Sequence, residues 1–184
     1  PAAQGGGWLS PVTNQLQGGS SCGSCYAFAT LAQVEARIRI ATNGAQDDRL
    51  SVLDVLGCSP YSQGCDGGFP YLVGKYGMDY GFVKDGCLPY NMSKWEAAGG
   101  EAAPVDSYLA RDLPCERMYA GGGGGCRSVR RRVRNVRYVG GYYGNATELE
   151  MRRELATKGP LTVGLFADRN FTMYSSGVYR SVVR

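Results

Sequence analysis

The 184-residue sequence predicts an α+β fold in which a helical part comes first and a β-rich part follows. Residues 24–40 repeat apolar side chains every three or four positions, the period of an amphipathic helix: Phe28, Leu31, Val34 and Ile38. Residues 133–143 and 161–166 are short runs rich in valine, tyrosine or leucine, which predict strands. With 43% hydrophobic residues, the chain can bury a core of one or two domains.

The segment before the first helix is expected to be non-helical. Residues 1–7 are mostly small and are predicted to form a flexible leader. Pro11 disfavours helix at the residue before it, so residues 8–15 are predicted to be extended. Residues 17–21 are rich in glycine and serine, which is typical of a loop. The helix therefore begins at or just before Cys25.

Two more helices are predicted in the first half of the chain. The first helix stops at the Thr-Asn-Gly sequence of residues 42–44. Residues 51–56 predict a short helix, with Ser51 and Asp54 as a capping pair. Residues 69–80 predict an irregular helix, which two glycines weaken: Gly74 and Gly77.

The middle of the chain lacks periodicity. Residues 86–127 include the small-residue tracts 97–103 and 121–125, and they predict a long surface excursion. Disulfides are expected to hold it through three cysteines: Cys87, Cys115 and Cys126.

One helix is predicted in the second half. Thr147 and Glu150 form a capping box, and the helix continues to about residue 157, before Gly159-Pro160 ends it. Residues 174–183 predict a last extended stretch.

Charge and hydropathy exclude some function classes. The net charge is +4, so composition does not call for a nucleic-acid partner. Six arginines lie within residues 127–137, and we interpret them as part of a solvated loop and strand rather than a polyanion site. No apolar run approaches the roughly 18 residues that a membrane-spanning helix needs.

Other features predict a processed protein of the secretory route. The sequence starts at Pro1, with no methionine and no signal-peptide pattern, which predicts a processed piece. Three Asn-x-Ser/Thr sequons are candidate glycosylation sites: Asn91, Asn145 and Asn170. Together with the cysteines, they indicate a secretory-route protein.

The seven cysteines are an odd number, so six can pair in an oxidising compartment and one stays free. Cys25 is the candidate, because free N–H groups at a helix N-terminus favour a reactive thiolate. A buried structural cysteine, or a redox or metal module built on Cys22-x-x-Cys25, are the alternatives. No metal site is predicted. The sequence has no histidine, so the base of a cysteine protease must come from another chain or segment.

The stretch Cys22-Gly23-Ser24-Cys25-Tyr26 matches the motif around the nucleophile of papain-like cysteine proteases. The chain therefore resembles that family. Residues 34–40, 67–72 and 138–144 are similar to its cathepsin C (dipeptidyl peptidase I) branch. The resemblance implies a two-domain fold, with a helical left domain over 1–126 and the start of a β-rich right domain over 127–184.

The resemblance implies a set of site residues. Cys25 is the nucleophile and Gln15 the oxyanion donor, with Gln17 as the alternative because the loop carries an insertion. The substrate-binding edge comprises Gly67, Gly68 and Pro70, although the glycines alone could simply form a tight turn. Chloride is the expected cofactor, and three aromatic residues that could otherwise be ordinary core residues line its site: Phe69, Tyr71 and Tyr138. The implied disulfides are Cys22–Cys65, Cys58–Cys115 and Cys87–Cys126.

The implied function is removal of dipeptides from free N-termini, in a lysosome or other acidic compartment of the secretory route, or outside the cell. The chain corresponds to a heavy chain. Its partners are a light chain with the catalytic histidine and asparagine, an exclusion domain and peptide substrates, in a tetramer of heterotrimers. An endopeptidase and a catalytically silent binding protein are the alternatives.

Overall fold

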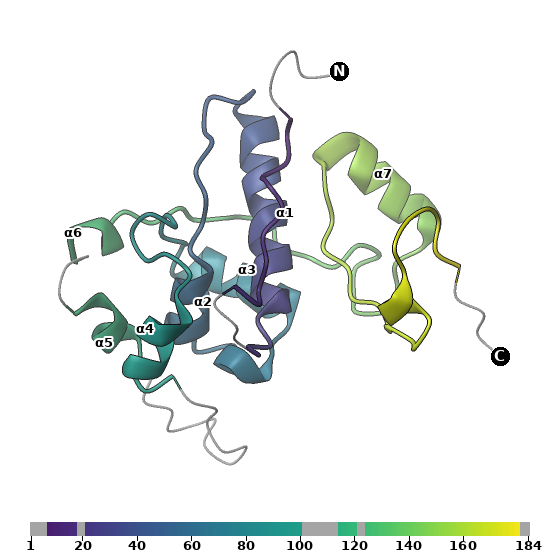
Figure 1. The fold of residues 1–184 in the computed structure, drawn as a ribbon. Helices are drawn as coiled ribbons and strands as arrows, with labels where there is room; N and C mark the ends of the chain where they lie inside the picture. The colour runs from purple at the N-terminus through teal and green to yellow at the C-terminus, as the bar shows by residue number, and fades with distance from the viewer. Residues whose placement is uncertain (1–6, 18–20, 101–113, 121–123, 181–184) are drawn as a thin grey trace.

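The computed structural model describes residues 7–17, 21–100, 114–120 and 124–180. Its centre is the long helix α1 (Cys25–Ala41), against which α2 (Val52–Cys58) and α3 (Pro70–Asp79) pack. Figure 1 shows α7 (Glu148–Lys158) on one side of α1 and the short helices of the middle of the chain on the other. The predicted helical first part is therefore present. The predicted leader (residues 1–7) lies almost wholly outside the described residues.

The first helix forms as predicted. It begins at Cys25, after Ser24, and buries one face that includes Tyr26, Ala27 and Leu31. The predicted stop is also present: the chain leaves the helix at Thr42, and Gly44 donates its N–H to the Arg39 carbonyl at 2.8 Å. The φ of Gly44 is +82°, which glycine adopts without strain.

Helix α2 is largely buried in the core. The prediction that Ser51 and Asp54 cap it was only half correct. The Ser51 hydroxyl accepts the N–H of Asp54 at 3.0 Å, as predicted. The Asp54 side chain does not return to the Ser51 backbone, whose N–H donates to the Val83 carbonyl at 3.0 Å. Instead, the fully buried Asp54 carboxylate accepts hydrogen bonds from two tyrosines and an arginine: Tyr76, Tyr119 and Arg130.

The two glycines of α3 permit close packing. A Cβ atom on Gly74 would lie 2.5 Å from a methyl carbon of Val136, and one on Gly77 would lie 2.3 Å from the Phe82 ring. Both contacts are closer than real Cβ atoms approach their neighbours. A larger residue at either position would push away the segment that packs there.

The prediction of a surface excursion over residues 86–127 was wrong for much of that segment. It contains three short helices: α4 (Met92–Ala97), α5 (Cys115–Tyr119) and α6 (Gly124–Arg127). Several of its side chains lie in the hydrophobic core: Leu88, Met92, Trp95, Met118 and Tyr119. Helices of one or two turns contain too few residues to show a period, so the sequence did not reveal them. Residues 101–113 and 121–123 lie outside the described residues.

The prediction of strands was wrong. In the described residues, pairing is limited to two isolated bridges, Leu50–Lys84 and Phe82–Arg131. The 161–166 segment, predicted to be a buried strand, exposes Val163, Leu165 and Phe166. A strand requires a partner for its backbone hydrogen bonds, and β-propensity alone does not supply one. The last predicted stretch, 174–183, is irregular as far as residue 180.

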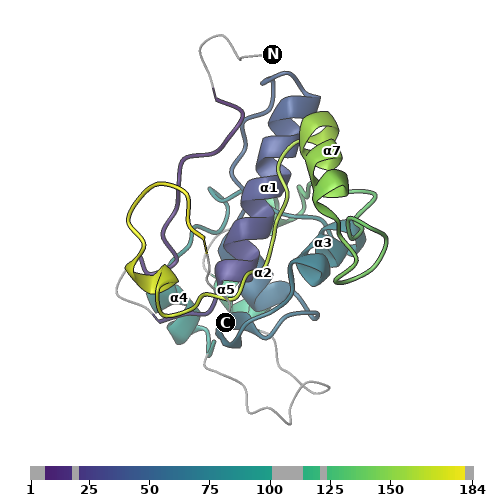
Figure 2. The same cartoon turned by 90° about the vertical axis from the view of Figure 1, so that its right-hand side faces the viewer.

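Polar contacts attach the second half of the chain to the helices. Helix α7 has the predicted capping box between Thr147 and Glu150, and it lies alongside the C-terminal half of α1 (Figure 2). Its Glu154 pairs with Arg37 of α1 at 3.2 Å and with Arg137 at 2.8 Å. Farther on, the Thr162 hydroxyl donates to the Gln33 side chain at 2.6 Å.

The arginine cluster, interpreted as part of a solvated loop and strand, is solvated only in part and forms no strand. Four of its members form ion pairs with carboxylates of the helical half or of the second half: Arg127–Glu116, Arg130–Asp54, Arg131–Asp48 and Arg137–Glu154. The cluster therefore joins the two halves. Among the described residues, no helix is long and apolar enough to cross a membrane.

Candidate active site

Cys25 is the free cysteine of the chain, and it lies exposed at the first position of α1. The other six cysteines form the three disulfides that the resemblance implied: Cys22–Cys65, Cys58–Cys115 and Cys87–Cys126. The thiol is therefore held at a fixed point, three residues from a disulfide, and is open to a ligand. This arrangement contradicts a redox pair of Cys22 and Cys25, because Cys22 is already bonded to Cys65.

The loop that follows Cys65 packs directly against the Cys22–Cys25 motif. Gly23 donates its N–H to the Cys65 carbonyl at 2.8 Å, and the Tyr26 hydroxyl donates to the Gly64 carbonyl at 2.9 Å. A Cβ atom on Gly68 would lie 2.6 Å from the Tyr26 ring. The Gly67-Gly68 pair thus lies beside the start of α1.

Gly67 forms a turn as well. Its φ of +113° requires glycine, and its carbonyl accepts the N–H of Gln63 at 3.0 Å. The next residues, Phe69 and Pro70, open helix α3, and Phe69 is exposed. Glycine backbone and the exposed Phe69 side chain therefore lie beside the motif.

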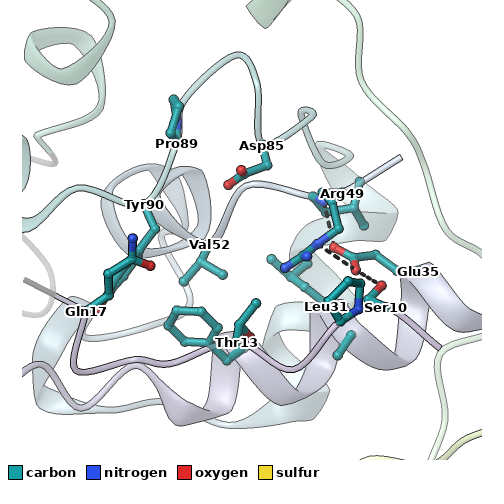
Figure 3. Close-up of a pocket in the computed structure, with 14 residues that line it drawn as sticks. Ser10, Thr13, Gln17, Leu31, Glu35, Arg49, Val52, Asp85, Pro89 and Tyr90 are labelled. Atoms are coloured by element: carbon teal, nitrogen blue, oxygen red, sulfur yellow. Dashed lines mark hydrogen bonds and ion pairs between the residues drawn. The ribbon is translucent and has the colours of Figure 1, made fainter. Parts of the chain in front are cut away.

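Gln15, rather than Gln17, lies against the motif. The Gln15 side-chain amide donates to the Cys22 carbonyl at 3.3 Å, and the Gln15 carbonyl accepts the Tyr90 hydroxyl at 2.8 Å. The N–H of Gln17 instead closes a turn by donating to the Asn14 carbonyl at 3.3 Å. The Gln17 side chain lines a cavity on the flank of α1 (Figure 3).

Tyr90 was not identified from the sequence. Its hydroxyl lies 3.2 Å from the Ser24 hydroxyl, and its ring meets the Phe28 ring edge-on, with the centroids 4.9 Å apart. It follows Pro89 in the aperiodic middle of the chain, and no local motif indicates that it reaches the first helix. Its contacts are with residues 62 to 75 positions earlier in the chain, which only the fold brings next to it.

The structure brings together two of the three aromatic residues assigned to an anion site. Tyr71 and Tyr138 come from distant segments, and their rings stack with centroids 4.7 Å apart at an interplanar angle of 13°. Both are partly exposed. The edge of the Tyr138 ring also meets Tyr143. Phe69 is in the same region of the chain, at the N-terminus of α3, but its side chain is exposed.

A cavity of about 180 Å³ on the flank of α1 does not include Cys25 or Gln15 (Figure 3). At one end, buried Glu35 accepts the Leu50 N–H at 2.7 Å and the Ser10 hydroxyl, and Arg49 lies 3.4 Å away. Burial raises the pKa of the Asp85 carboxyl above its usual range, which Arg49 opposes. The Glu35 and Arg49 charges are paired with each other, and the free thiol lies outside this cavity. The described residues contain no cluster that could hold a metal ion.

The three sequon asparagines are exposed. Asn91 caps α4 by accepting the Lys94 N–H at 3.0 Å, and Asn145 donates to the Gly140 carbonyl at 2.6 Å. Asn170 precedes the short 3₁₀ turn Phe171–Met173. All three side chains lie where a glycan would extend into solvent.

Comparison with known proteins identifies relatives of the whole chain. The family model described as papain family cysteine protease matches residues 3–184. The chain is 37% identical to cathepsin C of Schistosoma mansoni, over 93% of this chain and 32% of that protein. It is 31% identical to dipeptidyl aminopeptidase 1 of Plasmodium falciparum, over 91% of this chain and 29% of that protein.

A further relative is cathepsin B-like cysteine proteinase 4 of Caenorhabditis elegans. The chain is 29% identical to it, over 90% of this chain and 52% of that protein. The chain thus spans 29% to 52% of the length of these three relatives.

Proposed function

Because the chain belongs to the papain family of cysteine proteases, we propose that it carries the nucleophile of an exopeptidase that removes dipeptides from free N-termini. The observation that carries this proposal is the exposed, unpaired Cys25 at the start of α1, beside the Gly67-Gly68 loop. The dipeptidyl activity is supported by similarity to cathepsin C, which extends over 93% of the chain, and to dipeptidyl aminopeptidase 1, which extends over 91%.

The proposed chemistry begins with attack of the Cys25 thiolate on the carbonyl carbon of the second residue of the substrate. The Cys25 N–H and the Gln15 amide donate hydrogen bonds to the oxyanion that forms. The intermediate collapses, the C–N bond breaks, and the amine leaves with the proton that the base took from the thiol. Water then hydrolyses the thioester, which releases the dipeptide and restores Cys25.

The base is proposed to be an imidazole of another chain, since these 184 residues contain no histidine. We infer a light chain that supplies a histidine and an asparagine. The exposed apolar side chains of the unpaired extended segments support such a partner, because added strands would cover them: Val163, Leu165, Phe166 and Val178.

The proposed substrates are peptides that bind as extended chains along the Gly67-Gly68 loop, with Pro70 beside it. An exclusion domain that blocks the cleft beyond two residues would account for dipeptide release. A tetramer of heterotrimers completes the proposed assembly. Three disulfides and exposed sequons support a lysosomal, other acidic secretory-route or extracellular location.

Dipeptide release is directly testable. We expect the processed full-length protein to remove successive dipeptides from a peptide with a free amino terminus. A matched peptide with an acetylated terminus should stay intact. Mass spectrometry of the products over time measures both.

The alternative activity is that of an endopeptidase, and similarity to cathepsin B-like cysteine proteinase 4 favours it. Cleavage of the acetylated peptide at internal bonds would establish this alternative. Failure to cleave either peptide would indicate a catalytically silent relative.

We also propose a chloride ion beside Tyr138, Tyr71 and Phe69. The donors fit an anion, because backbone N–H groups beside Gly67-Gly68 and one phenol O–H can hold it without a full positive charge. The stacking of Tyr71 on Tyr138 brings that phenol close to the start of α3.

Replacing Tyr138 by phenylalanine tests the chloride proposal. The change keeps the stacked ring and removes one donor, so we expect the apparent dissociation constant for chloride to rise about 3- to 10-fold. Chloride titrations of dipeptide hydrolysis and of melting temperature measure it. The exposed Tyr142→Phe is the matched control. Activity and melting temperature that do not respond to halide in the wild-type protein would refute the site.

A further inference from the structure

We propose that Tyr90 is a positioning residue that prepares the oxyanion site by holding Gln15 in place beside the residue that precedes Cys25. The inference rests on the proposed function, because it assigns Tyr90 a role in the same chemistry. It is carried by the position of one phenol hydroxyl between two segments that flank Cys25.

The hydrogen bonds have a defined direction. The Tyr90 hydroxyl has one proton, and it donates this proton to the Gln15 carbonyl at 2.8 Å. The Ser24 hydroxyl, 3.2 Å from the same oxygen, must therefore be the donor in the second contact. Tyr90 thus joins the segment that carries Gln15 to the residue that precedes Cys25.

Ser24 links Tyr90 to the start of α1. A serine before a helix usually accepts an N–H of the first turn, but the Ser24 side chain makes no such capping bond. Ser24 is fully buried, and its hydroxyl donates to Tyr90. The neighbouring N–H of Cys25 has no hydrogen-bond partner among the described residues, so it is available to an oxyanion.

Gln15 is anchored through its backbone rather than its side chain. The bond from Tyr90 fixes its carbonyl, whereas its amide makes only a long contact of 3.3 Å with the Cys22 carbonyl. The amide can therefore turn to a developing oxyanion without release of the backbone. Tyr90 is well suited to act as the anchor, since its segment is attached to the core.

Three contacts support the Tyr90 segment. Leu88 is fully buried, and its carbonyl accepts the Ser51 hydroxyl at 2.6 Å. Cys87 is bonded to Cys126. The Tyr90 ring packs on Phe28 of α1. Figure 3 shows Tyr90 at the end of the cavity that also holds Gln17, with the Glu35 and Arg49 group at the other end.

A double-mutant cycle in the processed full-length protein tests the role. We expect Tyr90→Phe to lower kcat about 3- to 10-fold with KM unchanged, because only transition-state contacts are loosened. Gln15→Ala should lower kcat about 10²- to 10³-fold, and Tyr90→Phe should cause no further loss in that background. Tyr80→Phe, at an exposed tyrosine outside the proposed site, is the control.

Two further readouts separate positioning from general damage. Active-site titration corrects kcat for any unfolded protein, and melting temperature checks that Tyr90→Phe folds. Alkylation of Cys25 by iodoacetamide should keep its rate, since substitution at a saturated carbon forms no oxyanion. A tenfold fall in alkylation would overturn the proposal by showing that Tyr90 acts on the thiol itself.

The outcomes distinguish this inference from the proposed function. An undiminished kcat in Tyr90→Phe, or a loss that multiplies with that of Gln15→Ala, overturns the positioning role alone. Full activity of Gln15→Ala, or a loss in Gln17→Ala in its place, overturns the oxyanion assignment and the positioning role with it. Equal kcat losses for Tyr80→Phe and Tyr90→Phe would also refute a specific role for Tyr90.

Discussion

Replacing Cys25 by alanine should abolish peptide hydrolysis by the processed full-length protein. We expect kcat to fall by about 10⁵- to 10⁶-fold, which is the scale observed when another covalent protease loses its nucleophile. No other free thiol of this chain is available to form the acyl-enzyme, because its remaining six cysteines are in disulfides. Initial rates on a dipeptide substrate, before and after the change, measure the effect.

The same variant gives a thiol count. The native wild-type protein should incorporate one alkyl group in this chain, at Cys25, and Cys25→Ala should incorporate none. The melting temperature should not change, because Cys25 is exposed and packs little surface. Equal labelling of Cys22 and Cys25 would contradict both the disulfide and the protease assignment.

The features that were predicted correctly from the sequence are local ones. A helix of 17 residues shows its period and its stop signal, and the capping box of α7 lies within four residues. The free thiol, Cys25, was singled out from a five-residue motif, and the disulfide pairing followed from the family resemblance. Each of these signals is readable within a short window or by comparison with relatives.

The features that were missed depend on partners far away in the chain. Val163 and Phe166 have the propensity for a strand, but no β-bridge joins their segment to another one in the described residues. Tyr90 acts only because the fold brings it to Gln15 and Ser24. Arg130 was interpreted as one member of a solvated cluster, but it forms an ion pair with Asp54, which lies 76 positions earlier in the chain.

Asp54 of α2 is the centre of a buried polar cluster, which joins α2 to α3, to α5 and to the segment that carries Arg130. Its carboxylate accepts the Tyr76 hydroxyl at 2.9 Å and the Tyr119 hydroxyl at 2.8 Å. Arg130 adds hydrogen bonds at 3.0 and 3.2 Å. Burial, then Asp54, raises the pKa of the Tyr76 and Tyr119 phenols above their ordinary value, so both stay protonated and can donate.

Replacing Asp54 by asparagine should therefore destabilise the protein strongly. The change keeps the volume but leaves the Arg130 guanidinium, whose side chain is only 19% exposed, without its counter-charge. Removing one partner of a buried ion pair lowers the free energy of unfolding by about 3–5 kcal/mol, and we expect a loss in this range. Urea unfolding of the processed full-length protein, followed by tryptophan fluorescence, measures it.

Asp79→Asn is the matched control, since Asp79 forms a similar pair with Lys75 at 2.6 Å but lies on the surface. Solvent screens such a pair, so its loss should leave the unfolding midpoint nearly unchanged. Arg130→Met should destabilise less than Asp54→Asn, because the two tyrosines still donate to the carboxylate. Equal midpoints for Asp54→Asn and Asp79→Asn would show that the Asp54 cluster does not hold the segments together.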